Sequence, residues 1–206
     1  YEISACLVGS EMCIRDRTLI DAVLAGRDVL GVMPTGGGKS LCYELPALLL
    51  PGLTLVISPL ISLMKDQVMA LQNAGIPAGC IHSAMSVEEL REAYRDTRFG
   101  AYKILYIAPE RLLTDGFCAL AQELEISLLA VDEAHCISQW GQDFRPSYMK
   151  IVEFVKTLEK RPIISAFTAT ATETVREDIV CTLGLQNPFT SVSYTHLRAH
   201  ETGRNL

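Results

Sequence analysis

The sequence lacks cysteine pairs at the spacing that structural zinc sites use. None of its seven cysteines belongs to a C-x-x-C pair, and five of them fall in or beside apolar runs (Cys42, Cys80, Cys118, Cys136 and Cys181). Zinc fingers and ribbons hold their metal through closely spaced Cys and His ligands. The spacing therefore argues against a structural zinc site. We interpret the cysteines as reduced, half-buried thiols of a cytosolic protein.

Basic residues are also scarce, because 18 Lys and Arg stand against 24 Asp and Glu, which leaves a net charge of −6. A protein that binds polyanions over its whole surface carries an excess of positive charge. A nucleic-acid site here must therefore be a local patch, or be completed by another domain. The 206 residues, 49% hydrophobic and 20% charged, suit one globular domain with a full hydrophobic core.

A continuous apolar run long enough for a transmembrane helix is missing. Residues 45–64 carry no charge and are about long enough to cross a bilayer. However, Pro51-Gly52 and Ser58-Pro59 interrupt the stretch. A helix end, a turn and a buried strand explain it better, so we expect no membrane partner.

Regular periodicity is missing from both ends of the chain. Residues 1–17 show neither helical nor strand periodicity and lack the basic start of a signal peptide. Residues 191–206 do not continue the pattern that precedes them. Both segments are similar to translated adapter sequence, and we interpret them as an artefactual leader and an artefactual tail. Natural disordered tails are the alternative, and the domain is placed at 18–190.

Between these ends, short β-rich runs alternate with helical patterns. Ser86 to Glu89 reads as a capping box, and Val175, Ile179 and Leu183 share one face of a helix that stops at Gly184. The alternation predicts an α/β fold, a mostly parallel sheet with helices on both faces and ligands at the carboxyl ends of the strands. Strands are predicted at 28–33, 53–57, 78–82, 102–107, 128–131 and, as the last one, 163–167.

A glycine-rich loop, Pro34-Thr35-Gly36-Gly37-Gly38-Lys39-Ser40, follows the first predicted strand and opens a helix at Lys39. Glycines let the backbone curl so that successive N–H groups face phosphates, and the helix N-terminus adds a favourable potential. Lys39 would reach the β- and γ-phosphates, and Ser40 would ligate Mg²⁺. The loop predicts ATP and Mg²⁺ as cofactors. A glycine turn with an incidental Lys-Ser is the alternative.

An acidic pair, Asp132-Glu133, follows another apolar strand and leads into Ala134-His135. One carboxylate at such a strand end can hold Mg²⁺ while its neighbour orients and deprotonates the attacking water. We assign the metal to Asp132, together with Ser40, and the base to Glu133. A solvated turn is the alternative reading of such a pair.

Five segments resemble, in order, the motifs of the RecQ family of DNA helicases. The resemblance covers nearly all of 28–190, and the stretch after the Asp-Glu-Ala-His box is its most specific part. It implies the first RecA-like motor domain, a P-loop fold, of an ATP-dependent 3′-to-5′ DNA helicase, in the cytoplasm and on the nucleoid of a bacterium or in the nucleus of a eukaryote. The segments are 33–43 (MPTGGGKSLCY), 58–68 (SPLISLMKDQV), 106–112 (YIAPERL), 131–146 (VDEAHCISQWGQDFRP) and 167–171 (FTATA).

The resemblance also implies a DNA-binding loop. In RecQ enzymes an aromatic-rich loop couples DNA contact to ATP hydrolysis, and Trp140, Phe144 and Arg145 match it. An aromatic ring and an arginine in a polar loop suit stacking on unpaired bases and contact with phosphate. A tryptophan packed in the core is the alternative for Trp140.

Other residues take their roles from the resemblance alone. Ser58-Pro59 and Glu110-Arg111 follow strands and would line the DNA track. Thr168 and Thr170 match the motif that links the nucleotide site to the DNA site. His135 would join that relay, although a lone histidine is more often a satisfied polar group.

Some family features fall outside this sequence. The adenine-reading Gln of RecQ proteins would fall near Asp16, within 1–17, which contains no Gln. The second RecA-like domain, its arginine finger and the zinc and winged-helix modules are not in these residues. The expected partners are single-stranded or duplex-junction DNA and a second RecA-like domain of the same parent chain, without which we expect no unwinding. The alternatives are an RNA-acting helicase-type ATPase, and a nucleotide- or DNA-binding module without turnover.

Overall fold

A seven-stranded sheet forms the centre of the protein, in a computed structural model that describes residues 14–34 and 38–193. The strands are ordered β3-β4-β2-β5-β6-β1-β7, and every neighbouring pair is parallel. The predicted α/β fold with a parallel sheet is therefore confirmed. The strands are β1 Val29–Val32, β2 Leu53–Ile57, β3 Ala78–Ile81, β4 Ile104–Ile107, β5 Ile126–Val131, β6 Ile163–Thr168 and β7 Phe189–Val192.

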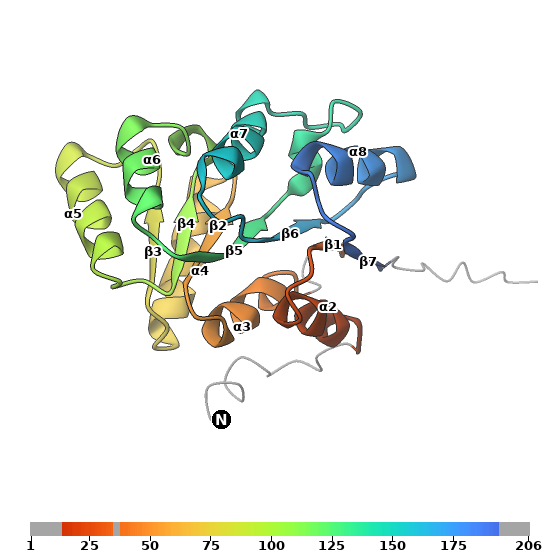
Figure 1. Ribbon diagram of the computed structural model, residues 1–206, viewed down its shortest axis with the longest axis horizontal. Coiled ribbons are helices and arrows are strands. Elements are labelled where there is room, and N and C mark those ends of the chain that lie inside the picture. The colour runs from red at the N-terminus through yellow and green to blue at the C-terminus, as the bar shows by residue number, and fades with distance from the viewer. Residues whose placement is uncertain (1–13, 35–37, 194–206) are drawn as a thin grey trace, which may run out of the picture.

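Helices cover both faces of the sheet (Figure 1). Two apolar cores result, one on each face, which is why nearly all residues of the inner strands are buried. One face carries α2 Ile14–Leu24, α3 Leu41–Leu49 and α4 Ile61–Asn73. The other carries α5 Val87–Arg98, α6 Asp115–Gln122, α7 Met149–Thr157 and α8 Glu173–Leu183, with short 3-10 helices at Pro109–Arg111, Ala134–Ile137 and Pro146–Tyr148.

Local signals in the sequence set several of these boundaries. Ser86 and Glu89 form the predicted capping box at the start of α5. Gly184 ends α8 in the left-handed conformation, as predicted. The uncharged stretch 45–64 divides into the end of α3, strand β2 and the start of α4. No helix among the described residues has the length and apolar character needed to cross a membrane.

Four details differ from the sequence-based expectation. The strand at 163–167 is not the last, because β7 pairs with β1 in parallel, with Val29 opposite Phe189. Helix α2 was not predicted, and the helix after the glycine loop begins at Leu41 rather than at Lys39. The proposed boundaries after residues 17 and 190 both fall inside elements, α2 and β7. The division into a leader, a domain and a tail stays a prediction.

Because the strands are parallel, the carboxyl ends of β1, β6, β5 and β2 lie side by side along one edge of the sheet, the edge at which these strands end. Val32 at the end of β1 lies opposite Thr168 of β6. Along the same edge, Val131 of β5 lies opposite Ile57 of β2. The loops that follow these strands carry the predicted site residues, so the sheet gathers segments that are more than 100 residues apart in the sequence.

Candidate nucleotide site and nucleic-acid loop

Four of the predicted site residues line one cavity at this edge of the sheet. Its volume is about 260 Å³, and its lining includes Lys39, Ser40, Asp132 and Glu133. Gly38, with φ +76°, provides the left-handed turn that precedes Lys39. Thr35, Gly36 and Gly37 of the predicted phosphate loop lie outside the described residues, whereas Pro34 is described and lies two residues after the end of β1.

Glu133 is held in an uncommon backbone conformation, with φ 47° and ψ 46°. Left-handed backbone is costly for a residue with a Cβ and occurs often at functional sites. In this position the Glu133 carboxylate lies 3.5 Å from Lys39 Nζ and 3.3 Å from His135 Nδ1. The hydrogen bond to His135, and then the charge of Lys39, lower the pKa of Glu133. The carboxylate is therefore ionised and already faces the lysine of the glycine-rich loop.

Asp132 is buried, and its backbone is fixed on both sides. Its N–H donates to the carbonyl of Ile57 at 2.9 Å, and its carbonyl accepts from the Tyr148 hydroxyl at 2.8 Å. Burial, and then the negative charge of Glu133, raise the pKa of Asp132. A buried carboxylate beside a second carboxylate is a place where a divalent cation lowers the electrostatic cost of the charged form.

A chain of polar contacts leads from Glu133 to the end of β6. His135 Nδ1 lies 2.8 Å from the Thr168 hydroxyl, which in turn donates to the carbonyl of Thr170 at 3.2 Å. Since the single Thr168 proton is used on Thr170, its oxygen must accept from His135. The sequence placed these residues in one relay by resemblance, and the structure brings them within hydrogen-bond distance.

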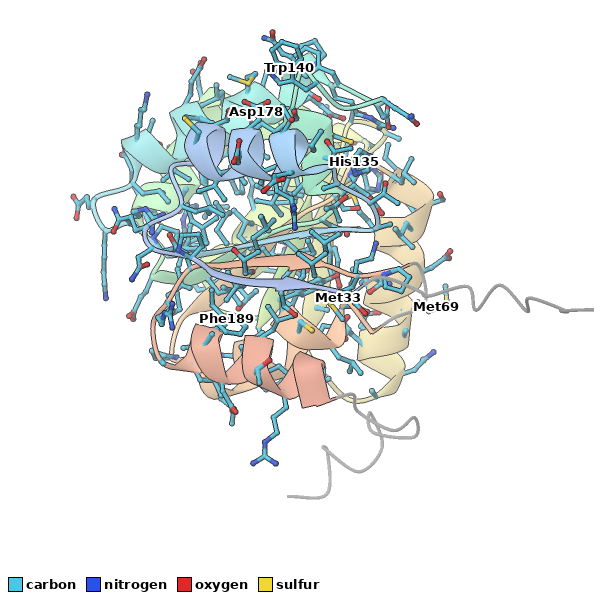
Figure 2. All side chains as sticks on the ribbon, turned by 90° about the vertical axis from the view of Figure 1, so that its right-hand side faces the viewer. Met33, Met69, His135, Trp140, Asp178 and Phe189 are labelled. Carbon is cyan, nitrogen blue, oxygen red and sulfur yellow. The ribbon has the colours of Figure 1, made fainter. Side chains whose placement is uncertain are left out.

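The loop after the Asp-Glu-Ala-His turn exposes its tryptophan. The Trp140 residue is 74% exposed, so the alternative in which it packs in the core is wrong. Figure 2 shows Trp140 at the outer end of the loop, with Asp178 of α8 below it. The buried Ser138 hydroxyl donates to Asp178 at 2.6 Å and accepts from the Trp140 N–H at 3.2 Å. This pair of bonds fixes the base of the loop to α8.

The second half of the loop is held by charge. Arg145 Nη2 lies 2.9 Å from the Asp143 carboxylate, and the Arg145 N–H donates to the Cys136 carbonyl at 2.8 Å. Arg145 and Phe144 are half-buried. A cavity of about 490 Å³ lies between this loop and the segment after β6; its lining is His135, Trp140, Gly141, Gln142, Asp143, Thr170, Ala171, Thr172 and Val175.

The residues predicted to line the DNA track are less uniformly placed. Glu110 is exposed, and Pro59 and Arg111 are half-buried. Ser58, in contrast, is 1% exposed, and its hydroxyl has no hydrogen-bond partner among the described residues. The Ser58 hydroxyl lies beneath the surface after the end of β2, and its contact with DNA stays a prediction.

The sequence analysis missed a buried polar cluster next to the nucleotide cavity. The Tyr106 hydroxyl lies 3.3 Å from an oxygen of Glu44 and 3.3 Å from the side-chain oxygen of Gln67. Burial raises the pKa of Glu44 to about 7, although the bond from Tyr106 opposes the shift. Tyr43 and Gln67 also line the nucleotide cavity. The missed signal was the order of residues on α3, where a tyrosine and a glutamate follow the phosphate loop within an apolar helix.

Comparison with known proteins agrees with this geometry. Residues 16–178 match the DEAD/DEAH box helicase family. Over 155 residues the chain is 54% identical to ATP-dependent DNA helicase RecQ of Bacillus subtilis (strain 168), covering 75% of this chain and 26% of that protein. It is 48% identical over 170 residues to ATP-dependent DNA helicase RecQ of Pasteurella multocida (strain Pm70), covering 82% of this chain and 27% of that protein. The chain thus spans about a quarter of the length of these curated relatives.

Solved helicase structures share the fold. The crystal structure of the DUF1998 helicase MrfA superposes with a TM-score of 0.74 and 17% identity, over 93% of this chain and 32% of that one. At this identity the likeness shows a common RecA-like architecture and no more. The family match covers most of the sequence, and the two RecQ relatives are 54% and 48% identical over 155 and 170 residues. The chain therefore belongs to the DEAD/DEAH box helicase family, within which its relatives are the RecQ helicases.

Proposed function

We propose that this chain is the first RecA-like motor domain of an ATP-dependent 3′-to-5′ DNA helicase of the RecQ type. The observation that carries the proposal is the meeting of Lys39, Asp132 and Glu133 at one cavity, with His135 and Thr168 leading away from it. The named activity of the relatives is that of proteins about four times as long. Unwinding is accordingly proposed for a parent chain that also supplies a second motor domain.

The residues at the cavity suit magnesium-bound ATP, which when bound supplies the phosphoryl bond whose hydrolysis drives a motor. Lys39 can exchange its 3.5 Å contact with Glu133 for the β- and γ-phosphates. Ser40 and Asp132 offer the oxygen ligands that Mg²⁺ prefers. Glu133, released from Lys39, can take the proton of the attacking water. The arginine finger that stabilises transition-state charge would come from the second domain.

The Trp140 loop, residues 136–146, is the proposed contact with single-stranded DNA. An exposed indole can stack on an unpaired base, which contributes about 1–3 kcal/mol per base. Arg145 would meet phosphate once it leaves Asp143, and Pro59, Glu110 and Arg111 would continue the track. Because the loop begins three residues after Glu133, at Cys136, its ordering on DNA can reposition the catalytic carboxylate. The His135–Thr168 contact would carry the same change towards β6.

Nucleotide binding by the chain itself tests the phosphate-loop assignment. Calorimetric titration with Mg²⁺-ATP should give weak binding that Lys39→Ala abolishes. Lys156→Ala, which removes an exposed lysine on α7, is the matched control and should bind as the unmodified chain does. Equal affinities for the Lys39→Ala variant and the unmodified chain would show that the phosphate site lies elsewhere.

Hydrolysis is tested in a parent chain that contains both motor domains. Glu133→Gln should keep nucleotide binding and reduce turnover by about two orders of magnitude or more, since the water loses its base. Near-normal turnover in this variant would move the base to another residue.

The nucleic-acid assignment needs a separate measurement in the same parent. Trp140→Ala and Arg145→Ala should spare basal ATPase activity and weaken its stimulation by single-stranded DNA. Full stimulation in both variants would remove the coupling role, whereas stimulation recovered at saturating DNA would make the loop a docking surface only. Stronger stimulation of the unmodified parent by RNA than by DNA would favour an RNA-acting motor.

A further inference from the structure

Three side chains that could ligate a metal ion converge at the start of the Trp140 loop, just after the acidic turn formed by Asp132 and Glu133. The ligand atoms of His135, Cys136 and Asp143 all lie within 4.8 Å of one another. Cys136 Sγ is 3.8 Å from His135 Nε2 and 3.7 Å from Asp143 Oδ2. Cys136 is buried, whereas Asp143 is exposed. The cluster therefore joins the inner end of the loop to its outer part.

The hydrogen bonds around His135 determine which ring nitrogen carries the proton. The Thr168 hydroxyl donates its only proton to the Thr170 carbonyl, so it accepts from His135 Nδ1–H. In the neutral ring, Nε2 then presents a lone pair towards Cys136. Asp143 Oδ2 accepts from Arg145 at 2.9 and 3.3 Å and from the Cys136 thiol at 3.7 Å. When the thiol proton is directed at Asp143, the Nε2 lone pair of His135 receives no proton from Cys136, and a bound cation would satisfy that lone pair.

The second nitrogen of His135 has the surroundings typical of a metal ligand. Histidines that bind metals usually donate their other N–H to a carboxylate or a similar acceptor, which fixes the ring and raises its basicity. Here His135 Nδ1 lies 2.8 Å from the Thr168 hydroxyl and 3.3 Å from the Glu133 carboxylate. The ring is thus oriented with Nε2 directed at the thiol.

The separations fit a tetrahedral ion. Bonds of about 2.0–2.1 Å to nitrogen or oxygen and about 2.3 Å to sulfur put the sulfur roughly 3.5–3.6 Å from each neighbouring ligand atom. The two sulfur distances, 3.8 and 3.7 Å, are slightly longer, so a bound ion would draw the ligands together by a few tenths of an ångström. The cavity of about 490 Å³ beside His135 and Asp143 leaves room for water at a fourth position. A thiolate with an imidazole selects Zn²⁺ or Cd²⁺ over Mg²⁺.

We propose that His135, Cys136 and Asp143 form a three-ligand site for a thiophilic divalent cation, Zn²⁺ or Cd²⁺. On binding, the Cys136 thiol releases its proton to solvent and a metal–sulfur bond forms, while His135 Nε2 and the Asp143 carboxylate each donate a lone pair. No electron transfer is involved. Arg145, which pairs with Asp143 at 2.9 Å, competes for the carboxylate, so the site is weaker than a four-ligand structural zinc site.

Occupation of this site would tie the loop to the acidic turn. Trp140 lies between Cys136 and Asp143 and is the single tryptophan of the whole sequence. Its fluorescence therefore reports on this loop alone. Binding can be measured in the absence of nucleotide and DNA, so the proposal stands or falls independently of the proposed motor function.

The experiment is a titration of the full, reduced chain with Cd²⁺ and with Zn²⁺ in the presence of excess Mg²⁺. We expect a saturable change in Trp140 fluorescence and, for Cd²⁺, a parallel rise in thiolate-to-metal absorption. Cys136→Ser and Asp143→Asn should each weaken binding at least about tenfold. Two variants are matched controls and should bind as the unmodified chain does. Cys118→Ser removes another half-buried thiol, whose Sγ donates to the Leu112 carbonyl. Asp96→Asn removes the charge of another Asp–Arg pair, that of Asp96 with Arg95.

Circular dichroism checks that each variant is folded. If Cys136→Ser does not fold, the exposed Asp143→Asn variant decides the question against Asp96→Asn. Unchanged affinity in Asp143→Asn, or in a folded Cys136→Ser, would overturn the proposal. Failure of the Trp140 signal to saturate, or equal losses in the Cys118→Ser control, would also overturn it, because the metal would then bind other thiols.

Discussion

Replacing Glu44 with Gln should make the folded protein more resistant to alkaline pH. Glu44 lies on α3 and is 6% exposed. One of its oxygens is 3.3 Å from the Tyr106 hydroxyl, and no Lys or Arg forms a salt bridge with it among the described residues. Burial raises its pKa from 4.5 to about 7. The folded state therefore favours the protonated carboxyl.

The sign and size of the effect follow from this shift. Between pH 4.5 and 7 the unfolded chain has lost the Glu44 proton while the folded chain keeps it, so the free energy of unfolding falls as the pH rises. At about 1.4 kcal/mol per pKa unit, the full loss is about 3 kcal/mol, of which about 2–3 kcal/mol falls between pH 5 and pH 8. Gln remains neutral throughout and keeps an oxygen for Tyr106, so this loss should disappear in the variant.

Urea denaturation at pH 5 and pH 8 measures the effect. The stability of Glu44→Gln relative to the unmodified chain should increase by about 2–3 kcal/mol between the two pH values, or by about 5–10 °C in Tm. Glu92→Gln, an exposed glutamate on α5, is the control and should show no such gain. A relative stability that does not change with pH would show that Glu44 is ionised in the folded protein at neutral pH, and the reasoning would fail.

Two further predictions concern buried hydrogen bonds. Asp28 is 3% exposed, pairs with Arg161 at 2.6 Å and accepts from two backbone N–H groups. Asp28→Ala should lower the free energy of unfolding, measured by urea denaturation, by about 3 kcal/mol or more. A loss below about 1 kcal/mol would show that these contacts do not stabilise the fold. Ser138→Ala removes the hydroxyl that joins Asp178 to the Trp140 N–H. This variant should lose about 1–2 kcal/mol and lower the fluorescence anisotropy of Trp140, and unchanged anisotropy would show that other contacts hold the loop.

Local sequence chemistry determined much of the fold. The capping box at Ser86 and the left-handed Gly184 are decided by neighbouring residues, and both were read correctly. Apolar strands between helical patterns require a sheet covered on both faces, so the parallel architecture also followed. Strand β7 was missed because it is a half-buried edge strand whose place depends on pairing with β1, not on its own pattern. Helix α2 was missed for a similar reason, since its place depends on packing against the sheet and α3.

The sequence alone also predicted Lys39, Asp132 and Glu133 as site residues, because glycine loops and acidic strand ends have chemistry that depends on residue type and order. Only the tertiary structure decided how these residues meet. The 3.5 Å contact between Lys39 and Glu133 joins residues 94 positions apart, and it depends on the left-handed turn at Glu133. The exposure of Trp140 and the convergence of Cys136 with its neighbours likewise depend on how the loop folds back on α8 and β6. Distances between side chains from different strands are set by packing and register, which sequence spacing does not encode.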